Sequence, residues 1–322
     1  MILSDVQWYI ILFAFIMDFI LGDPLWLPHP VVFMGKAIEK AEPFFRKIIK
    51  NQFISGFWFA LSLIFSTWFV TFLVLRLCFL INPFFAHIVE IILLFFCLSA
   101  KTLEKAACNV ADSLKNSGLS KAKKKLAMIV GRDVNFLDET GVIRAVIETV
   151  AENFVDGFLS PLFFALIGGI PFAMAYKMIN TLDSMVGYNN KKYSLFGRTA
   201  ARIDDAANFI PARIAVFIIS FAAYFLFGKK KSRNSFKYGF KEGRLHKSPN
   251  SGYAEASFAG ALMVKLGGPN YYGGILVEKP FIGTKFKDPD VNKITMACDL
   301  MLLSSFISAI LSLLVLFFTK IL

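Results

Sequence analysis

Carboxylates at regular spacing are the first feature of this sequence that could do chemistry. In Glu148-Thr-Val-Ala-Glu152-Asn-Phe-Val-Asp156, three acids follow one another at intervals of four residues. We expect a helix from about Leu137, capped by Asp138, which would place all three acids on one face. Like charges at this spacing repel unless a cation or basic side chains lie against them, and Mg²⁺ takes such oxygen ligands together with substrate phosphate. The acids are therefore candidate metal ligands, and a solvated acidic face is the alternative.

A second acidic cluster combines two carboxylates with an amide. Asp204, Asp205 and Asn208 stand at i, i+1 and i+4, a spacing at which a carboxylate and the amide can share a cation. We expect this cluster and the pair Glu148 and Glu152 to converge on one Mg²⁺–phosphate site. Nearby arginines could hold phosphate oxygens through paired N–H donors, and these are Arg198, Arg202 and Arg213. An internally neutralised salt-bridge network is the alternative explanation.

Two further segments carry histidines. In Leu21-Gly-Asp-Pro-Leu-Trp-Leu-Pro-His-Pro-Val31, prolines hold Asp23 and His29 at fixed positions beside an apolar run. From composition alone, a capped turn with Trp26 at the membrane interface is the better explanation of this segment, and the fixed Asp and His keep the functional one open. The other segment, His246-Lys-Ser-Pro-Asn250, precedes the glycine-rich stretch 267–274, whose backbone amides could form an anion-binding nest.

Roles can be assigned to these residues from their chemistry. An imidazole with a pKa of about 6.5 can take a proton at neutral pH, so His246 is the first candidate for a proton acceptor, although a lone histidine is more often structural. The other catalytic candidates are Glu152, Asp23 and His29. The candidate substrate-binding residues are Arg132, Asn153, Asp183, Tyr188, Arg198, Arg202, Arg213, Lys247, Ser248, Asn250, Asn270 and Tyr271. The common nucleotide, dinucleotide, zinc-protease and serine-hydrolase signatures do not occur in the sequence.

The elements that must position these residues are too apolar for a water-soluble domain. Of 322 residues, 56% are hydrophobic and 18% charged, against about 25% charged in a soluble domain. Six apolar stretches approach the roughly 20 residues that a membrane-spanning helix needs. They are 6–21, 53–80, 84–100, 158–179, 210–227 and 301–319.

Two features leave the number of spans at five or six. The first and third stretches are short and carry polar residues, so each could be a tilted, interfacial or bundle-buried helix. The fourth stretch contains Gly168-Gly-Ile-Pro171, so a broken or re-entrant helix competes with a simple span.

The polar segments between the apolar stretches suggest the topology. The net charge is +12, and the basic loops 22–52, 101–156 and 229–299 adjoin membrane ends, so the positive-inside rule places them on the cytoplasmic face. The side of the fourth polar loop, 180–208, stays open. We predict an all-α fold, a polytopic integral membrane helical bundle that forms one domain over 1–322, multi-pass in the cell membrane, with long polar helical loops on the cytoplasmic face. The basic excess indicates topology rather than nucleic-acid binding.

Several ordered blocks resemble the CobD/CbiB family of adenosylcobinamide-phosphate synthases. They are Gly22-Asp-Pro…Pro28-His-Pro-Val, Gly131-Arg-Asp, Glu148-Thr-Val-Ala-Glu-Asn, Asn180-Thr-Leu-Asp-Ser-Met-Val-Gly-Tyr, Asp204-Asp-Ala-Ala-Asn…Pro-Ala-Arg, His246-Lys-Ser-Pro-Asn and Gly267-Gly-Pro-Asn-Tyr-Tyr-Gly-Gly. The resemblance implies an enzyme of cobalamin biosynthesis that uses ATP and Mg²⁺. It would join the carboxylate of adenosylcobyric acid to the amine of (R)-1-amino-2-propanol O-2-phosphate, or a related amino-alcohol phosphate, giving adenosylcobinamide phosphate. Expected partners are these substrates, the lipid bilayer and other membrane-associated corrinoid-assembly enzymes.

Two other classes of function remain open at this point. An intramembrane, Mg²⁺-dependent prenyltransferase would also use acidic pairs, to which Asn180-x-x-Asp183 and Asp204-Asp205 correspond. A transporter of an anionic solute would explain basic loops and a broken helix, but repeat symmetry, which such transporters show, is not evident in the sequence.

Overall fold

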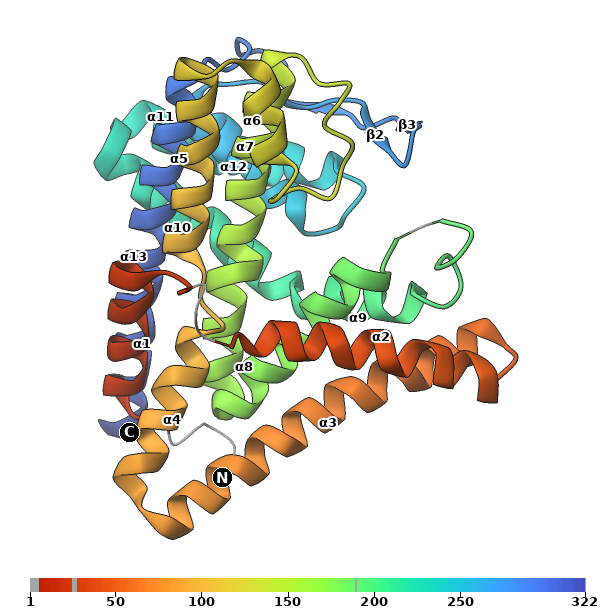
Figure 1. Cartoon of the computed structure of the whole chain (residues 1–322). Helices are drawn as coiled ribbons and strands as arrows, with labels where there is room; N and C mark the ends of the chain where they lie inside the picture. The colour runs from red at the N-terminus through yellow and green to blue at the C-terminus, as the bar shows by residue number, and fades with distance from the viewer. Residues whose placement is uncertain (1–5, 25–27, 189, 322) are drawn as a thin grey trace. The chain divides into compact units, whose positions relative to one another are not determined.

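The chain folds mainly into helices, as the sequence predicts (Figure 1). This computed structural model describes residues 6–24, 28–188 and 190–321, which leaves Trp26 outside the described residues. The contacts divide the chain into two compact units. Unit 1 comprises Met1–Ser99, Asp156–Asn208 and Ala309–Leu322, and unit 2 comprises Ala100–Val155 and Phe209–Ser308. That the chain forms one domain stays a prediction.

Unit 1 is built from long apolar helices whose ends carry local capping signals. Its helices are α1 (Trp8–Leu21), α2 (Pro30–Ile48), α3 (Gln52–Ile81), α4 (Pro83–Phe95), α8 (Ser160–Val186), α9 (Arg198–Ala207) and the last part of α13 (Asn292–Ile321). The side chains of Asn51 and Asn82 accept the first free N–H groups of α3 and α4. His29 caps α2 in the same way through Nδ1, which accepts the Val31 N–H at 3.2 Å. The proline that follows it, Pro30, occupies the first helical position, where its missing N–H costs nothing.

A break interrupts α8 where the sequence places Gly168-Gly-Ile-Pro171. Gly168 and Gly169 leave the helical region, and Gly169 has a φ of 75°, which a residue with a side chain rarely adopts. The broken helix is therefore the better of the two sequence interpretations. A cavity of about 460 Å³ adjoins the break and has Arg76, His87 and Glu90 in its lining.

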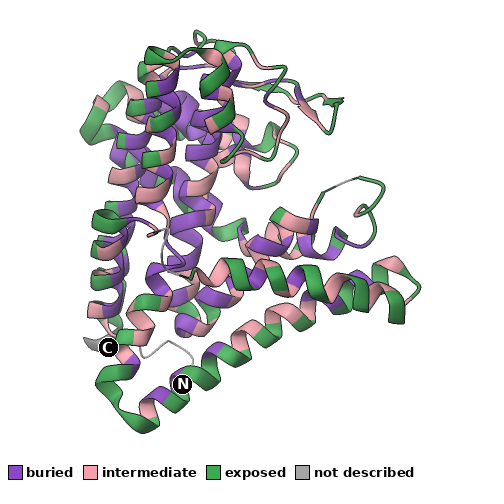
Figure 2. Cartoon of the chain, viewed as in Figure 1, coloured by how far each residue is buried: buried purple, intermediate pink, exposed green. Residues whose placement is uncertain are grey.

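Unit 2 packs its helices around one short helix made of small residues. Its elements are α5 (Ala100–Asn116), α6 (Leu119–Leu126), α7 (Glu139–Phe154), α10 (Phe209–Phe227), α11 (Lys229–Glu242), a 3-10 turn (Gly243–Leu245), α12 (Ser251–Leu262) and the first part of α13. Every residue of α12 from Ala254 to Leu262 is buried, and α7, α10 and α11 lie against it (Figure 2). Gly260 lets α11 approach closely, because a Cβ there would meet the Asn234 carbonyl oxygen at 2.5 Å.

Four short strands accompany the helices in unit 2, where the sequence predicts only glycine-rich turns. Strand β1 (Leu266–Gly267) pairs antiparallel with β4 (Phe281–Ile282), and β2 (Asn270–Tyr272) pairs antiparallel with β3 (Ile275–Val277). The turn between β2 and β3 uses Gly273 and Gly274, both with positive φ. This segment brings the backbone of Gly267 against α7.

The apolar helices identify a multi-pass membrane protein. Among the described residues, five helical stretches are long and apolar enough to cross a bilayer: Gln52–Ile81, Pro83–Asn116, Glu139–Val186, Phe209–Phe227 and Asn292–Thr319. Helix α1, with 14 residues, is shorter than such a span. Large apolar side chains on α3, such as Phe65, Val70 and Leu80, are exposed, as lipid-facing residues are. The sidedness of the polar loops stays a prediction.

Candidate functional site

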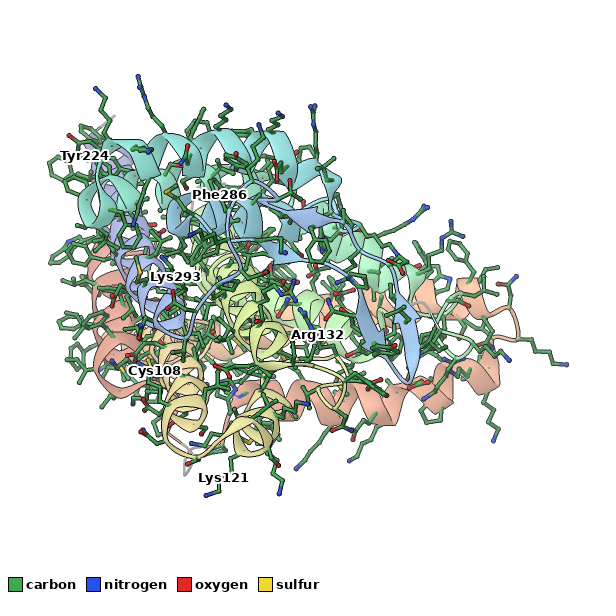
Figure 3. The ribbon with its side chains drawn as sticks, turned by 90° about the horizontal axis from the view of Figure 1, so that it is seen from above. Cys108, Lys121, Arg132, Tyr224, Phe286 and Lys293 are labelled. Atoms are coloured by element: carbon green, nitrogen blue, oxygen red, sulfur yellow. The ribbon has the colours of Figure 1, made fainter. Side chains whose placement is uncertain are left out.

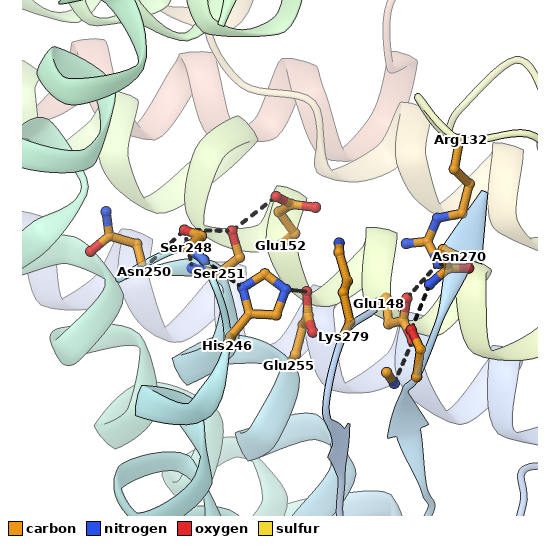
Figure 4. A network of polar contacts seen from close by, with 12 residues as sticks. Arg132, Glu148, Glu152, His246, Ser248, Asn250, Ser251, Glu255, Asn270 and Lys279 are labelled. Carbon is orange, nitrogen blue, oxygen red and sulfur yellow. Dashed lines mark hydrogen bonds and ion pairs between the residues drawn. The ribbon is translucent and has the colours of Figure 1, made fainter. Parts of the chain in front are cut away.

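The polar side chains of unit 2 meet in one network between α7, the start of α12 and the segment 266–279 (Figure 4). We call it the unit 2 network; it consists of Arg132, Glu148, Glu152, His246, Ser248, Asn250, Ser251, Glu255, Asn270, Tyr272 and Lys279. Seen from above, Arg132 lies among the inner side chains, whereas Lys121 points outward from the edge (Figure 3).

One end of the network is a buried ion pair between the segment before α7 and α7 itself. Asp138 caps α7 as the sequence predicts, since its Oδ1 accepts the Gly141 N–H at 2.6 Å. Arg132 Nη1 lies 2.8 Å from Glu148 Oε2, and the two side chains are only 11% and 5% exposed. Burial alone would lower the pKa of the Arg132 guanidinium, but the Glu148 carboxylate outweighs this effect and raises it. The Arg132 guanidinium therefore stays charged in spite of its burial.

Glu148 also fixes the glycine-rich segment. Its second oxygen, Oε1, accepts the Gly267 N–H at 2.7 Å, and Arg132 Nη1 donates to Asn270 Oδ1 at 3.2 Å. The Asn270 amide in turn donates to the Gly268 carbonyl at 3.0 Å. The first amide of the predicted anion-binding nest is thus occupied by a carboxylate of the chain itself.

The other end of the network joins α7 to the segment before α12. Ser251 Oγ donates to Glu152 Oε1 at 2.9 Å, and Ser248 Oγ accepts the backbone N–H groups of Asn250 and Ser251. His246 Nδ1 accepts the Ser248 N–H at 3.1 Å, and Nε2 lies 3.9 Å from Glu255 Oε1. The turn 246–251 is therefore ordered by its own side chains.

These contacts restrict the protonation of His246 and Glu255. Burial, and then the charge of Lys279, lower the pKa of His246, so its ring is neutral near pH 7. With Nδ1 accepting an N–H, the neutral ring carries its proton on Nε2, on the side of Glu255. Burial, followed by the charges of Glu148 and Glu152, raises the pKa of Glu255 well above its ordinary value. Proton acceptance by His246 needs the Nδ1 bond to open, and this role stays a prediction.

Lys279 supplies a second cation to the network. Its Nζ donates to the Tyr272 hydroxyl at 3.0 Å. Burial lowers its pKa, but the bond to Tyr272 and the charge of Tyr272 outweigh this, so the pKa of Lys279 is raised. Sequence reasoning selected neither Lys279, Glu255 nor Ser251. Glu255 could have been selected from the sequence, because it is the only acid within the run 251–262 of mostly small residues. Lys279 could not, because nothing in its sequence context distinguishes it from other lysines in loops.

A pocket of about 300 Å³ adjoins the Arg132 end of the network. Arg132, Arg144 and the backbone of 267–270 contribute to its lining. Arg144 is held over the Phe281 ring at 5.5 Å, with Asp288 at 3.9 Å. The lining also includes the carboxylates of Asp138 and Glu148, so an anionic ligand such as phosphate would bind on the side of the pocket where the two guanidinium groups lie.

The other predicted residues of unit 2 have mainly local partners. Asn153 donates to the Thr149 carbonyl at 3.0 Å, and the Tyr271 ring lies tilted against that of Phe136, with ring centroids 4.3 Å apart. Arg213 donates to Asn250 Oδ1 at 2.9 Å and to the Pro249 carbonyl at 3.2 Å. Arg213 thereby holds the turn before α12. Lys247 is exposed.

In unit 1, the cluster 204–208 forms a hydrogen-bonded network. Asn208 is buried, and its Oδ1 accepts from Ser160 Oγ at 2.6 Å and from the Tyr176 hydroxyl at 2.9 Å. Its amide donates to Asp204 Oδ2 at 3.0 Å. Burial raises the pKa of Asp205. Because the Asn208 oxygen already accepts two bonds, a cation shared with a neighbouring carboxylate would have to displace one of them.

The remaining predicted residues of unit 1 lie apart from that cluster. Asp23 and His29 form an ion pair of 3.6 Å on a separate pocket. Arg198, Arg202 and Tyr188 are exposed, and Asp183 is half-buried in α8.

The predicted Mg²⁺ site cannot be assembled from either unit alone. Glu148 and Glu152 belong to unit 2, whereas Asp156, Asp204, Asp205 and Asn208 belong to unit 1. Within the described parts of the chain, no group of three or more His, Cys, Asp or Glu side chains is placed to hold a metal ion. The metal ligands and their convergence stay predictions.

The fold and the network define a class: a polytopic helical membrane protein with a buried, charged site. Comparison with known proteins then gives the family, because the CobD/CbiB protein family model matches residues 11–301. The chain therefore belongs to the CobD/CbiB family, as the sequence blocks suggest. This membership favours the cobalamin assignment over the prenyltransferase and transporter alternatives.

Similar proteins cover nearly the whole chain. A cobalamin biosynthesis protein CobD of Clostridium perfringens is 42% identical over 306 residues, which cover 95% of this chain and 96% of the relative. The CobD protein of Klebsiella pneumoniae is 42% identical over 91% of this chain and 92% of its own. The cobalamin biosynthesis protein CbiB of Salmonella typhimurium is 41% identical with the same coverage. No solved structure matches the chain.

Proposed function

We propose that this protein is an ATP-dependent amide ligase of cobalamin biosynthesis. It would join the carboxylate of adenosylcobyric acid to the amine of (R)-1-amino-2-propanol O-2-phosphate, or a related amino-alcohol phosphate. One observation carries the proposal: a CobD/CbiB chain buries two cations, Arg132 and Lys279, among acids beside an anion-sized pocket. Ligation of two anionic substrates needs such a site.

The chemistry follows from the poor reactivity of a carboxylate. Its oxygen attacks the terminal phosphorus of ATP, giving an acyl phosphate and ADP. The amine then attacks the acyl carbon, an amide bond forms, inorganic phosphate leaves, and the amine gives up a proton to a base. Arg132 and Arg144 are placed to hold phosphate oxygens at their pocket.

A divalent cation would share in binding the phosphates. Of the predicted ligands in unit 2, Glu148 fits poorly, because both of its oxygens already accept hydrogen bonds or an ion pair, and Glu152 would bind the metal only if His246 is the base. Glu152 accepts the Ser251 hydroxyl through Oε1. Mg²⁺, when bound, would neutralise phosphate charge. The membrane would be the cell membrane, with the network open to the cytoplasm.

The geometry shifts the role of proton acceptor from His246 toward Glu152. The free lone pair of the His246 ring lies on Nδ1, and the Ser248 N–H occupies it. Glu152 is half-buried on the same network, and its carboxylate can accept a proton without breaking a bond to the backbone. His246 would then act as a positioning residue for the turn 246–251.

The function is tested with purified protein in lipid nanodiscs. We expect adenosylcobyric acid, ATP, Mg²⁺ and the amino-alcohol phosphate to give a corrinoid whose mass is the sum of the two substrates less one water, with equal amounts of ADP and phosphate. The exposed-lysine variant Lys121→Met is the matched control and should keep wild-type turnover. Folded protein that forms neither the corrinoid nor ADP would overturn the proposal.

The two candidate bases are separated by single variants. Glu152→Gln should lower kcat by about 10²-fold or more, since a general base typically contributes 10²- to 10⁴-fold. His246→Asn should lower kcat less, because the asparagine oxygen can still accept the Ser248 N–H. The reverse order, with His246→Asn the more damaging, would return the base to His246.

A further inference from the structure

A polar pocket of unit 1 has no role in the chemistry described so far. It has a volume of about 370 Å³ and lies where the segment before α2, the end of α4 and the second half of α8 meet. Asp23 and His29 line it from one side, and Lys177, Asn180 and Thr181 line it from α8. We call it the Lys177 pocket. It is large enough for a small polar metabolite and far too small for a corrinoid.

The acidic side of the pocket is an aspartate that lies against a histidine. His29 Nε2 lies 3.6 Å from Asp23 Oδ1, and both side chains remain about one-fifth exposed, at 23% and 22%. Because His29 Nδ1 accepts the Val31 N–H, the ring proton lies on Nε2, toward Asp23. The ring therefore orients the carboxylate toward the pocket.

The basic side of the pocket is a single lysine on an apolar helix. Lys177 Nζ has a long contact of 3.5 Å to the Cys97 carbonyl, and within the described residues it forms no ion pair. A charged lysine on a membrane helix is costly and usually marks a function. A charge that lacks a partner within the described chain suits an anionic ligand.

We propose that the Lys177 pocket binds a small zwitterion that carries an ammonium group and a phosphate. Asp23 would receive the ammonium group, Lys177 the phosphate, and the Asn180 amide would add a donor to the phosphate oxygens. Among the described lining residues, Asp23 and Lys177 are the only acid and the only lysine or arginine, so their charges match such a ligand one to one. Resting on the proposed function, this assigns the pocket to the amino-alcohol phosphate substrate.

The proposal is tested by binding alone, without ATP or corrinoid. Isothermal titration of the full chain in nanodiscs would use (R)-1-amino-2-propanol O-2-phosphate, the same amino alcohol without phosphate, and 2-propyl phosphate, which lacks the amine. We expect the zwitterion to bind at least 10-fold more tightly than either single-charge probe. Lys177→Met should lower the affinity for both the zwitterion and 2-propyl phosphate by about 10-fold or more. Asp23→Asn should lower the affinity for the zwitterion but not for 2-propyl phosphate.

Two controls keep the test decisive. Lys36→Met changes an exposed lysine on α2 and should bind as the wild type does. Lys177→Arg keeps the positive charge and should retain binding, which separates loss of charge from misfolding. The assignment would be overturned if folded Lys177→Met bound the zwitterion with wild-type affinity. It would also be overturned if Asp23→Asn lost affinity equally for the zwitterion and for 2-propyl phosphate.

Failure of this inference is distinguishable from failure of the proposed function. Charge-dependent binding of the zwitterion without any amide product would contradict the ligase chemistry and leave the pocket assigned. Amide formation whose KM for the amino-alcohol phosphate is unchanged in Lys177→Met and Asp23→Asn would contradict the pocket and leave the ligase standing.

Discussion

The unit 2 network and the Lys177 pocket handle buried charge in opposite ways. In the network, Glu148 is paired with Arg132, Glu152 accepts from Ser251, and the pKa of the fully buried Glu255 rises well above its ordinary value. In the pocket, Asp23 pairs with His29, whereas Lys177 has only a long contact to a carbonyl and lies in no ion pair of the described residues. Buried charges that are paired within the chain hold the fold together, whereas a membrane-helix lysine with no acidic partner in the described residues is suited to an anionic ligand.

The strongest way to break this contrast is to remove one partner of the buried ion pair. Arg132→Met leaves the Glu148 carboxylate buried without its cation, which should cost about 3–5 kcal/mol of unfolding free energy. It should also release Asn270 and abolish amide formation. Thermal unfolding in detergent, followed by circular dichroism, measures the change. The double variant Arg132→Met/Glu148→Gln should recover most of the stability without activity; a double variant as unstable as the single one would show that the ion pair is not the cause.

The next largest effect is expected from replacing Glu255, which should change how the free energy of unfolding depends on pH. Because burial raises the pKa of this acid in the folded chain, the folded state keeps its proton above about pH 4.3, where the unfolded chain loses it. The free energy of unfolding therefore falls as pH rises from about 4.3 to the folded pKa. Glu255→Gln removes this titration, so the variant should exceed the wild type at pH 8 by about 1–3 kcal/mol and match it near pH 4. Melting curves at both pH values measure the difference.

His246 gives that experiment an internal check, since it titrates in the opposite sense. Burial lowers the pKa of this histidine, so the unfolded chain binds a proton below about pH 6.5 before the folded chain does, and stability is lost as pH falls through this range. His246→Asn should remove the loss between pH 6.5 and 5. If the difference in unfolding free energy between Glu255→Gln and the wild type did not grow with pH, the elevated pKa of Glu255 would be contradicted.

The smallest effect should come from an exposed ion pair of unit 1. Lys192 Nζ lies 3.2 Å from Glu42 Oε1, but the lysine side chain is 61% exposed. Solvent screens such pairs, so Lys192→Met should change the unfolding free energy by less than about 0.5 kcal/mol. The same melting assay measures it. A loss comparable to that of Arg132→Met would refute the link between burial and the strength of the effect.

Local signals made part of this structure predictable from sequence. The Asp138 cap and the break at Gly168 and Gly169 are confirmed, because each depends on residues within one or two helical turns. The apolar run lengths likewise predicted the long helices, because a bilayer imposes a minimum length on any span.

Contacts between distant segments were not predictable in the same way. Glu148 accepts from the backbone of Gly267, 119 residues further along the chain, so its role as a clamp depends on tertiary structure. The strands in 266–282 are only two or three residues long and have no periodicity to detect. Lys177 stands inside the apolar run 158–179, in which the sequence singles out the Gly-Gly-Ile-Pro break and not the lysine, and its pocket is formed by three separate segments.

The break in α8 bears on how the chain enters the bilayer during synthesis. A continuous apolar helix such as α3 can move into lipid alone, because its backbone N–H and C=O groups bond to one another. Helix α8 cannot enter lipid alone, because the non-helical backbone at Gly168 and Gly169 interrupts its backbone hydrogen bonds within the apolar part of the helix. We expect α8 to enter lipid only together with α3 and α4, the two long apolar helices among those that pack against it in unit 1. The order of insertion would then follow the completion of this three-helix group rather than the order of synthesis.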